Sequence, residues 1–282
     1  METLKLSGLT LEGFAQGGIR TSFGCPEIGA MFDAGTVIPT CLRYDHVFVT
    51  HGHPDHIGAI TNIVARRSLQ KLPPINIYVP KSISEDLKSI FHLWWKINGG
   101  HGPPFPANVL GKKVGDSITL KQGLTVHGVE TFHRIDSMGW SVDRTTNKLK
   151  KEFLGLKGAD IGALKKKGVE VTDPKTETLL TVPGDTKIEF LLSEERARKA
   201  RTLVHEVTIW SDDDSTIDRC RRYGHTHYKE MISHCEKFEG DNLILCHRSM
   251  KYSRNFIEKR LKKDFPASMR DRIQIFDGGD RG

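Results

Sequence analysis

The 282-residue sequence contains no apolar run of the roughly 18 residues that a membrane-spanning helix needs. Its first residues, Met1 to Lys5, lack the basic segment and the long apolar run that mark a secretory signal. Cysteine is scarce, and its five copies are irregularly spaced and form no C-x-x-C pair. These absences argue against a membrane protein and against a secreted disulfide framework. We therefore expect an intracellular protein with reduced thiols, in the first instance a cytoplasmic one, with the nucleus or an organelle left open.

Acidic residues are also in short supply, 35 against 42 lysines and arginines, which gives a formal net charge of +7. The excess lies in two segments: residues 144–168 hold eight basic and two acidic residues, and residues 248–272 hold nine and three. Each segment has a surplus of six positive charges, so the remainder of the chain is net acidic. Two basic patches on an acidic body favour a polyanionic partner such as a nucleic acid. The alternative is two solvated faces, and charge alone does not decide between them.

Short β-type runs alternate with helical stretches, which predicts a layered α/β fold. Several of the runs are apolar throughout, as expected of sheets that are covered on both faces. The predicted strands are Ile28–Asp33, His46–Thr50, Ile75–Val79, Leu124–Thr131, Leu179–Val182, Leu203–Val207, Leu243–Cys246 and Arg272–Phe276. The predicted helices are Ile57–Leu69, Ser82–Ile97, Tyr228–Phe238 and Ser253–Lys263, with Ser82 and Glu85 marking the start of the second.

Two segments interrupt this pattern. Residues 99–106 are rich in Gly and Pro and predict a loop. Residues Thr145 to Asp173 are rich in Lys and Gly, and we expect them to leave the sheet without a rigid fold of their own. No linker divides the chain, so we expect one domain spanning residues 1–282, with residues 146–170 as an inserted basic arm.

The most informative segment is Val47–Gly58, where a β-type run enters a tight loop and a helix follows. Within six positions the loop offers His51, His53, Asp55 and His56. Imidazole and carboxylate groups suit Zn²⁺, and one tetrahedral site cannot readily use all four from so short a loop. The pattern therefore predicts two adjacent half-sites that need further His or Asp ligands from other strand ends.

Three residues of the required type follow predicted strands: His133, Asp185 and His247. Any one of them alone is as well explained as a hydrogen-bonded core or surface residue. That explanation does not account for seven ligand-type residues in this order. The sequence therefore predicts a dinuclear metal centre.

Longer stretches around these residues resemble a known family. They are Phe32–Gly35, Thr131–Trp140, Pro183–Thr186, Leu203–Thr208, Tyr223–His227, His234–Phe238 and Ile244–His247. The loop that carries His51, His53, Asp55 and His56, here called the metal loop, resembles the metallo-β-lactamase superfamily together with its downstream residues. From about Leu6 to Phe276 the chain resembles the short tRNA 3′-processing endonucleases, the ribonuclease Z family. The alternatives are a related hydrolase of a small phosphodiester or other small ester, and a metal-free nucleic-acid-binding relative. Exonuclease activity is also left open.

This resemblance implies a four-layer αββα sandwich and two zinc ions per chain. The implied ligands are His51, His53 and His133 for one zinc and Asp55, His56 and His247 for the other, with Asp185 bridging them. The implied catalytic residues are Asp55 as general base and His225, oriented by Glu206, as the acid that protonates the leaving ribose 3′-oxygen. The implied reaction cuts the 3′ trailer from a tRNA precursor and leaves a 3′-hydroxyl on the tRNA and a 5′-phosphate on the trailer.

The resemblance also implies a homodimer and a tRNA-gripping arm between the positions of His133 and Asp185. Residues 146–170 lie there, and the candidate substrate-binding residues are Lys148, Lys150, Lys151, Lys157, Lys165, Lys166 and Lys167. A-form RNA stems present phosphates and 2′-hydroxyls, which lysines on an arm can contact without reading sequence. Whether a 3′ CCA blocks cleavage cannot be read from the sequence.

Three further residues near the expected site have supporting roles. We expect Asp33 to hydrogen-bond a ligand imidazole without binding metal. We expect His205 and His227 to support the loops on which they lie. The sequence assigns no role to Arg248.

Overall fold

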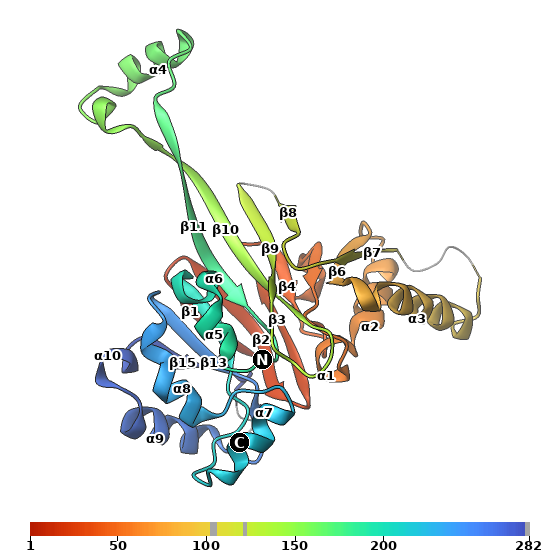
Figure 1. The fold of residues 1–282 in the computed structure, drawn as a ribbon. Helices are drawn as coiled ribbons and strands as arrows, with labels where there is room; N and C mark the ends of the chain where they lie inside the picture. Colours follow the sequence, from red (N-terminus) through yellow and green to blue (C-terminus); the bar gives the residue numbers. More distant parts are fainter. Residues whose placement is uncertain (102–105, 121–122, 280–282) are drawn as a thin grey trace.

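The computed structural model describes residues 1–101, 106–120 and 123–279, so the centre of the predicted loop at 99–106 lies outside the described residues. Within the described residues, two mixed β-sheets lie face to face (Figure 1). The first contains β1 (Glu2–Leu6), β2 (Leu9–Gly17), β3 (Arg20–Cys25), β4 (Ala30–Phe32), β5 (His46–Phe48), β6 (Ile75–Pro80) and β7 (Ala107–Lys112) in chain order, with β14 (Arg248–Ser249) paired to β2. The second contains, from edge to edge, β15 (Ile273–Ile275), β13 (Asn242–Cys246), β12 (Thr202–Glu206), β11 (Thr172–Val182), β10 (Met138–Leu149), β9 (Leu124–Glu130) and β8 (Ser117–Thr119).

Helices cover the outer face of each sheet. The helices of the described residues are α1 (Pro54–Ile57), α2 (Ile60–Leu69), α3 (Ser84–Ile97), α4 (Gly158–Lys166), α5 (Glu189–Ser193), α6 (Glu195–Lys199), α7 (Ser215–Arg222), α8 (Tyr228–His234), α9 (Arg254–Asp264) and α10 (Ala267–Arg270). Of these, α4 lies at the tip of the basic arm and covers neither sheet (Figure 1). The buried residues of α2 and α3 pack against the first sheet, and those of α5, α6, α8, α9 and α10 pack against the second. No helix in the described ranges is long and apolar enough to cross a membrane.

Alternation along the strands explains why the inner runs are apolar throughout. In β5, Phe48 joins the core between the two sheets, whereas Val47 joins the core under α2 and α3. In β13, Ile244 faces the core between the sheets, and Leu243 and Leu245 face the helices. Successive strand residues point to opposite faces, so a strand that is buried on both faces must be apolar at every position. The predicted four-layer αββα sandwich is confirmed.

The predicted strands are present with their ends displaced by one or two residues, except that β11 begins at Thr172 and not at Leu179. Strands β1, β2, β3, β7, β8 and β10 were absent from the sequence prediction. In the N-terminal hairpins the reason is glycine, which obscures the β pattern. A Cβ added to Gly13 would lie 2.1 Å from the carbonyl oxygen of Ser22, so the close approach of β2 and β3 requires glycine there.

Two predicted helix starts were wrong. The helix expected over Ile57–Leu69 is two elements, because α1 ends at Ile57 and α2 begins at Ile60. The start expected at Ser82 is a 3-10 turn, and α3 begins at Ser84. The hydroxyl of Ser82 donates to Asp136 in a tertiary contact, so it does not cap the helix.

The basic segment leaves the sheet as predicted, and it contains regular structure that the sequence pattern did not indicate. Strands β10 and β11 continue beyond the sheet as an antiparallel ribbon, paired from Arg144 with Glu177 to Leu149 with Thr172. At the tip, α4 forms through Gly162 and buries none of its residues. Figure 1 shows this arm projecting away from both sheets. The ribbon is polar on both faces because both face solvent, which removes the alternation that would have predicted strands.

The topology brings the predicted site residues to one edge of the sandwich. Strand β12 runs parallel to both β11 and β13, so their carboxyl ends share an edge. Asp185, Glu206 and His247 lie at or just after those ends. The opposing sheet brings its metal loop to the same place, where Thr50 O accepts a hydrogen bond from Met138 N and His51 forms an isolated bridge with Ser137.

Candidate metal centre and active site

The metal loop follows β5 directly and ends in a single helical turn. His53 is the N-cap of α1, and Pro54 occupies its first position, where no amide donor is needed. Asp55 and His56 therefore lie within the turn, and His51 and His53 lie before it. This change from extended to helical backbone separates the two pairs, as the sequence predicted.

One cluster of donor atoms forms around His51, His53, His133 and one oxygen of Asp185. His51 Nε2 lies 3.0 Å from His53 Nδ1, and His133 Nε2 lies 3.4 Å from the same His53 nitrogen. Asp185 Oδ2 lies 3.7 Å from His51 Nε2. Three imidazoles and a carboxylate oxygen thus point at a common position.

A second cluster contains Asp55, His56 and His247. His56 Nε2 lies 3.1 Å from His247 Nε2, which in turn lies 3.3 Å from Asp55 Oδ2. The other oxygen of Asp185, Oδ1, lies 3.2 Å from His247 Nε2 and 3.3 Å from His56 Nε2. The carboxylate of Asp185 therefore faces both clusters, one oxygen to each.

This donor set fits bound cations. Asp185 is 2% exposed, and its Oδ1 is buried without a hydrogen-bond partner within the described structure. A buried carboxylate oxygen without a donor is costly, and a metal ion is one of the few groups that can compensate it. Neutral imidazole and carboxylate are also the ligands that Zn²⁺ and similar ions prefer.

Hydrogen bonds on the far side of the rings fix their orientation. His56 Nδ1 donates to Asp33 Oδ2 at 2.8 Å, as expected for Asp33, and His133 Nδ1 donates to the carbonyl of Gly224 at 3.0 Å. Thr50 Oγ1 lies 3.0 Å from His51 Nδ1, and Thr208 Oγ1 lies 3.1 Å from His247 Nδ1. Each of these contacts leaves Nε2 with a lone pair directed into the cluster.

For three of the imidazoles and for Asp185, the surroundings favour the protonation states that metal ligands need. His56 differs, because Asp185 and Asp33 outweigh burial and raise its pKa well above the usual range. Burial lowers the pKa of His51, His53 and His133, so these imidazoles are neutral at physiological pH. Burial opposes ionisation of Asp185, but the nearby His247 and His56 rings outweigh it and hold its pKa well below the usual range. Metal ions bind neutral imidazole and ionised carboxylate.

A His–Glu pair lies beside both clusters. His225 Nδ1 donates to Glu206 Oε1 at 2.7 Å and is 3.9 Å from Asp185 Oδ2. Burial lowers the pKa of His225, but the charge and hydrogen bond of Glu206 outweigh burial and raise it to about 9. The same ring lies within ligand distance of Asp185 and His247, so a ligand role is the geometric alternative to an acid role.

Three residues with parts in this geometry were missed in the sequence. Thr50 joins Asp33 to His51. Thr208 Oγ1 donates to Glu206 Oε2 at 2.7 Å while also contacting His247. Gly224 adopts φ +79°, and a Cβ there would lie 2.7 Å from His133 Nδ1. Thr50, Thr208 and Gly224 lie within or beside the recognised stretches, but nothing in the pattern distinguished them from their neighbours.

The structure supplies a role for Arg248. It is buried, and its Nε donates to Asp277 Oδ2 at 2.6 Å. His247 next to it has φ +58°, a conformation that non-glycine residues adopt only when their surroundings hold them. The buried ion pair and the pairing of Arg248 with Gln16 hold the strand that carries His247.

Of the two neighbouring histidines, His227 has the supporting place expected for it, whereas His205 lies within β12 and not on a loop. His205 is fully buried, and its Nδ1 donates to the carbonyl of Glu206 at 2.8 Å. His227 is the N-cap of α8 and forms a capping box with Glu230. Neither belongs to a donor cluster of the described residues.

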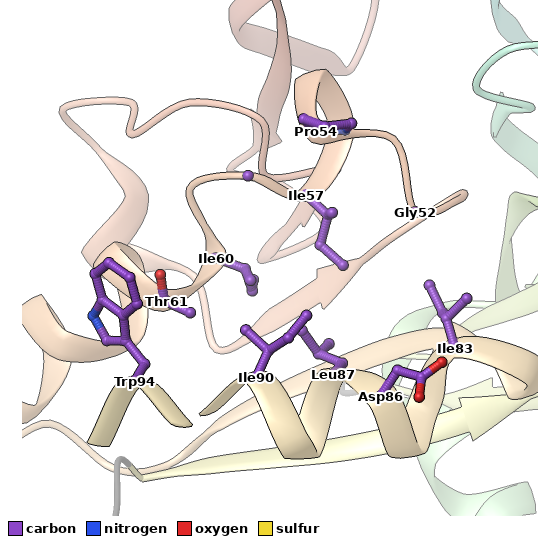
Figure 2. A pocket seen from close by; sticks show the side chains of 11 residues that line it. Gly52, Pro54, Ile57, Ile60, Thr61, Ile83, Asp86, Leu87, Ile90 and Trp94 are labelled. Atoms are coloured by element: carbon purple, nitrogen blue, oxygen red, sulfur yellow. The ribbon is translucent and has the colours of Figure 1, made fainter. Parts of the chain in front are cut away.

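An apolar groove of about 470 Å³ lies on the other side of the metal loop, between α1, the start of α2, and α3. Figure 2 shows Pro54, Ile57 and Ile60 on one wall and Leu87, Ile90 and Trp94 on the other. The metal loop therefore separates a polar site from an apolar groove.

Asp33→Asn should weaken metal binding by about 10- to 100-fold, the usual effect of losing a partner of a ligand imidazole. The asparagine side chain keeps an oxygen that accepts a hydrogen bond from the backbone NH of Thr50. It loses the negative charge of the carboxylate that accepts from His56 Nδ1. Competition with a graded chelator measures the change. Asp241→Asn, at an exposed carboxylate, is the matched control. Equal metal retention in both variants would contradict a supporting role for Asp33.

Comparison with known proteins places this geometry in a family. A family model described as "Beta-lactamase superfamily domain" matches residues 35–150. The tRNase Z TRZ1 of Arabidopsis thaliana is 36% identical over 259 residues, which cover 91% of each chain. The chloroplastic tRNase Z TRZ2 of the same plant is 30% identical over 88% of this chain and 70% of its own. The short form of human tRNase Z has the same fold, with a TM-score of 0.58 at 18% identity over 86% of this chain and 93% of its own. The chain therefore belongs to the tRNase Z family and has the metallo-β-lactamase fold.

Proposed function

We propose that this chain is a zinc-dependent endoribonuclease that cuts the 3′ trailer from tRNA precursors. The products are a tRNA with a 3′-hydroxyl and a trailer with a 5′-phosphate. Membership of the tRNase Z family supports the reaction. The observation that carries it in this chain is the pair of donor clusters that share Asp185, with the His225–Glu206 pair beside both.

The two clusters supply the proposed ligands. His51, His53 and His133 would hold one zinc, Asp55, His56 and His247 would hold the other, and Asp185, which faces both clusters, would serve both. Zinc at these positions would polarise the scissile phosphate and make water acidic enough to attack near neutral pH.

The proton transfers then fall to residues of the chain. Asp55 has a lowered pKa. Burial opposes its ionisation, but the hydrogen bond with His247 and the charges of His56 and His247 together outweigh burial, so Asp55 is ionised and can accept the proton of the attacking water. His225 has a raised pKa and is cationic near neutral pH, so it can donate a proton from Nε2 to the leaving 3′-oxygen. Glu206 holds Nδ1 of His225 and is itself fixed by Thr186 N and Thr208 Oγ1.

The basic arm, residues 146–170, is proposed to hold the body of the tRNA. Lys150 is the one arm lysine with a carboxylate nearby in the described structure, Asp173 Oδ1 at 3.8 Å. The other arm lysines have their charge available for phosphates. The arm contains no proposed metal ligand and neither member of the His225–Glu206 pair, so its contribution is binding and not chemistry. The intracellular location expected from the sequence stays a prediction.

The direct test is to incubate the purified protein with an end-labelled tRNA precursor and to map the cut. We expect one cut after the last nucleotide of the tRNA, with the 5′-phosphate on the trailer. Progressive shortening from the 3′ end would replace the endonuclease with an exonuclease. Hydrolysis of small phosphodiesters without cleavage of the precursor would favour the small-substrate alternative.

Carefully purified protein should contain about two zinc ions per chain, because seven ligands exceed the needs of one tetrahedral site. Elemental analysis after gel filtration measures the number. Well under one metal ion per chain in fully active protein would contradict the proposal. Another divalent ion at the same stoichiometry would change the identity of the metal only.

His225→Ala should lower kcat on precursor tRNA by roughly 10²- to 10⁴-fold and leave the metal content unchanged, because it removes one general acid. Asp55→Ala should abolish cleavage, since it removes a ligand and the base together. Loss of metal in His225→Ala would instead make His225 a ligand. An RNA with an activated leaving group should depend less on His225.

The pH profile gives a separate test of the pair. The rate should fall as pH rises through the pKa of His225, because only the protonated ring can act as the acid. Glu206→Gln removes the carboxylate that raises this pKa, so the alkaline fall should move to lower pH. An unchanged alkaline limb in Glu206→Gln would show that another group limits the rate there.

Replacing residues 146–170 by a short Gly/Ser link should raise KM for precursor tRNA strongly and flatten the salt dependence of binding. Each lost phosphate contact lowers the slope by about 0.7–0.9. Hydrolysis of a small phosphodiester should survive, because no proposed ligand or catalytic group is removed. An equal loss of activity on both substrates would show that the arm supports the fold or the site. No loss of activity on tRNA would show that the arm is a solvated loop without a binding role.

We also propose that the chain forms a homodimer. The supporting feature is a set of exposed apolar residues on α3, 47–76% exposed: Ile90, Leu93, Trp94 and Ile97. Two of them, Ile90 and Trp94, line the groove in Figure 2. Light scattering across a range of concentrations should therefore give a dimer. Leu93→Asp combined with Ile97→Asp should give a monomer, and Leu69→Asp, at a still more exposed leucine on α2, should not. A monomeric wild-type protein would remove the proposal.

A further inference from the structure

A second pocket, of about 260 Å³, opens beside the His225 side of the metal centre. Arg134, Arg219 and Tyr223 line this pocket together with His53 and His225. Tyr223 is 50% exposed, so one face of its ring is available for contact. The pocket therefore places the exposed ring of Tyr223 and the two arginines next to His225, the proposed acid, and His53, a proposed metal ligand.

Within the described part of the chain, the two arginines of this pocket do not stabilise the fold through ion pairs. Neither Arg134 nor Arg219 forms an ion pair with a carboxylate of the described residues. Arg221, on the same helix as Arg219, pairs with both Glu189 and Glu230. Helix α7 thus uses one arginine to anchor itself and presents another to the pocket. The guanidinium of Arg134 lies 5.7 Å from the ring centre of Tyr223, so the two side chains border the same space.

The pocket is held rigidly relative to the metal centre. Arg134 directly follows His133, and Tyr223 directly precedes Gly224, whose carbonyl accepts from His133 Nδ1. The backbone NH of His225 donates to the carbonyl of Cys220 at 3.1 Å, which ties the end of α7 to the acid. Tyr223, Arg134 and His225 therefore keep fixed positions around one opening.

We propose that this pocket binds the last nucleotide of the tRNA, the one whose ribose supplies the leaving 3′-oxygen. Tyr223 stacks on its base, and Arg134 and Arg219 bind its 5′-phosphate. The assignment rests on the proposed function, in which His225 protonates that 3′-oxygen, so the ribose lies against His225 and its base and 5′-phosphate extend into the adjoining pocket. Stacking on an aromatic ring accepts any base, which suits a position that a processing enzyme meets with different bases.

The test couples protein variants to substrate changes. Two precursor RNAs are prepared, one with an abasic site at the last tRNA nucleotide and one with an abasic site at the first trailer nucleotide. Wild-type protein should lose roughly five- to 100-fold in kcat/KM on the first, the usual effect of one lost stacking contact. Tyr223→Ala should show a similar loss on the intact precursor and no further loss on the first abasic RNA. Tyr223→Phe, which keeps the ring, should behave as the wild type.

The arginines are tested on the same substrates. Arg134→Gln and Arg219→Gln should raise KM for the precursor much more than KM for bis(p-nitrophenyl) phosphate, which has no 5′-phosphate for them to bind. Arg222→Gln is the matched control, because Arg222 is exposed on the same helix and does not line the pocket. An equal abasic penalty in wild type and Tyr223→Ala would overturn the proposal. Coupling of Tyr223 to the trailer nucleotide would overturn the assignment to the tRNA side. A wild-type protein that hydrolyses the small diester but no precursor would remove the proposed function itself, a result distinct from either.

Discussion

The site depends on one buried carboxylate with two faces. Asp185 lies at the end of a central strand, and its two oxygens point to different groups of imidazoles. Such a group is costly to bury, and its charge is balanced here by rings that come from both sheets. The sandwich must therefore close in one register, because a shift of either sheet would separate the carboxylate from half of its partners. Two features agree with the need for one register. The hydrogen bond from the His133 ring to the carbonyl of Gly224 and the φ +58° conformation of His247 each hold a proposed ligand in place and restrict the backbone there.

Protonation follows from the same arrangement. Burial alone would lower the pKa of every histidine in the site, and for His51, His53 and His133 it does so. His225 differs because Glu206 is aimed at its Nδ1, and Glu206 is held by Thr186 and Thr208 from opposite directions. Burial thus leaves three of these rings with lowered pKa values, whereas His225, beside Glu206, and His56, between Asp185 and Asp33, have raised pKa values. The difference comes from the carboxylates that face His225 and His56, which outweigh burial.

The sequence predicted those parts of the molecule in which chemistry or burial restricts the residue type. Four ligand-type residues between His51 and His56 have no good structural explanation, and strands buried on both faces had to be apolar, so both were readable. The ribbon was not readable, because solvent on both sides imposes no pattern on the chain. The roles of Thr50 and Thr208 could not be predicted either. A threonine that hydrogen-bonds a histidine ring of the site cannot be told from any other threonine before the structure shows where the rings lie. Arg248 needed the position of Asp277, 29 residues away, before its role could be seen.

The ribbon of the arm has a geometric consequence. Six residue pairs, from Arg144 with Glu177 to Leu149 with Thr172, carry α4 away from the sheet, which at about 3.3 Å per residue is roughly 20 Å. On the proposed function, the ribbon makes the protein a molecular ruler. If the arm binds the folded body of the RNA, the length of the ribbon sets the distance from the arm to the metal centre. That distance determines which bond is cut. Substrates with different sequences but the same tRNA shape would then be cut at the same place, and lengthening the ribbon by two residue pairs would displace the grip without altering either the grip or the cutting centre.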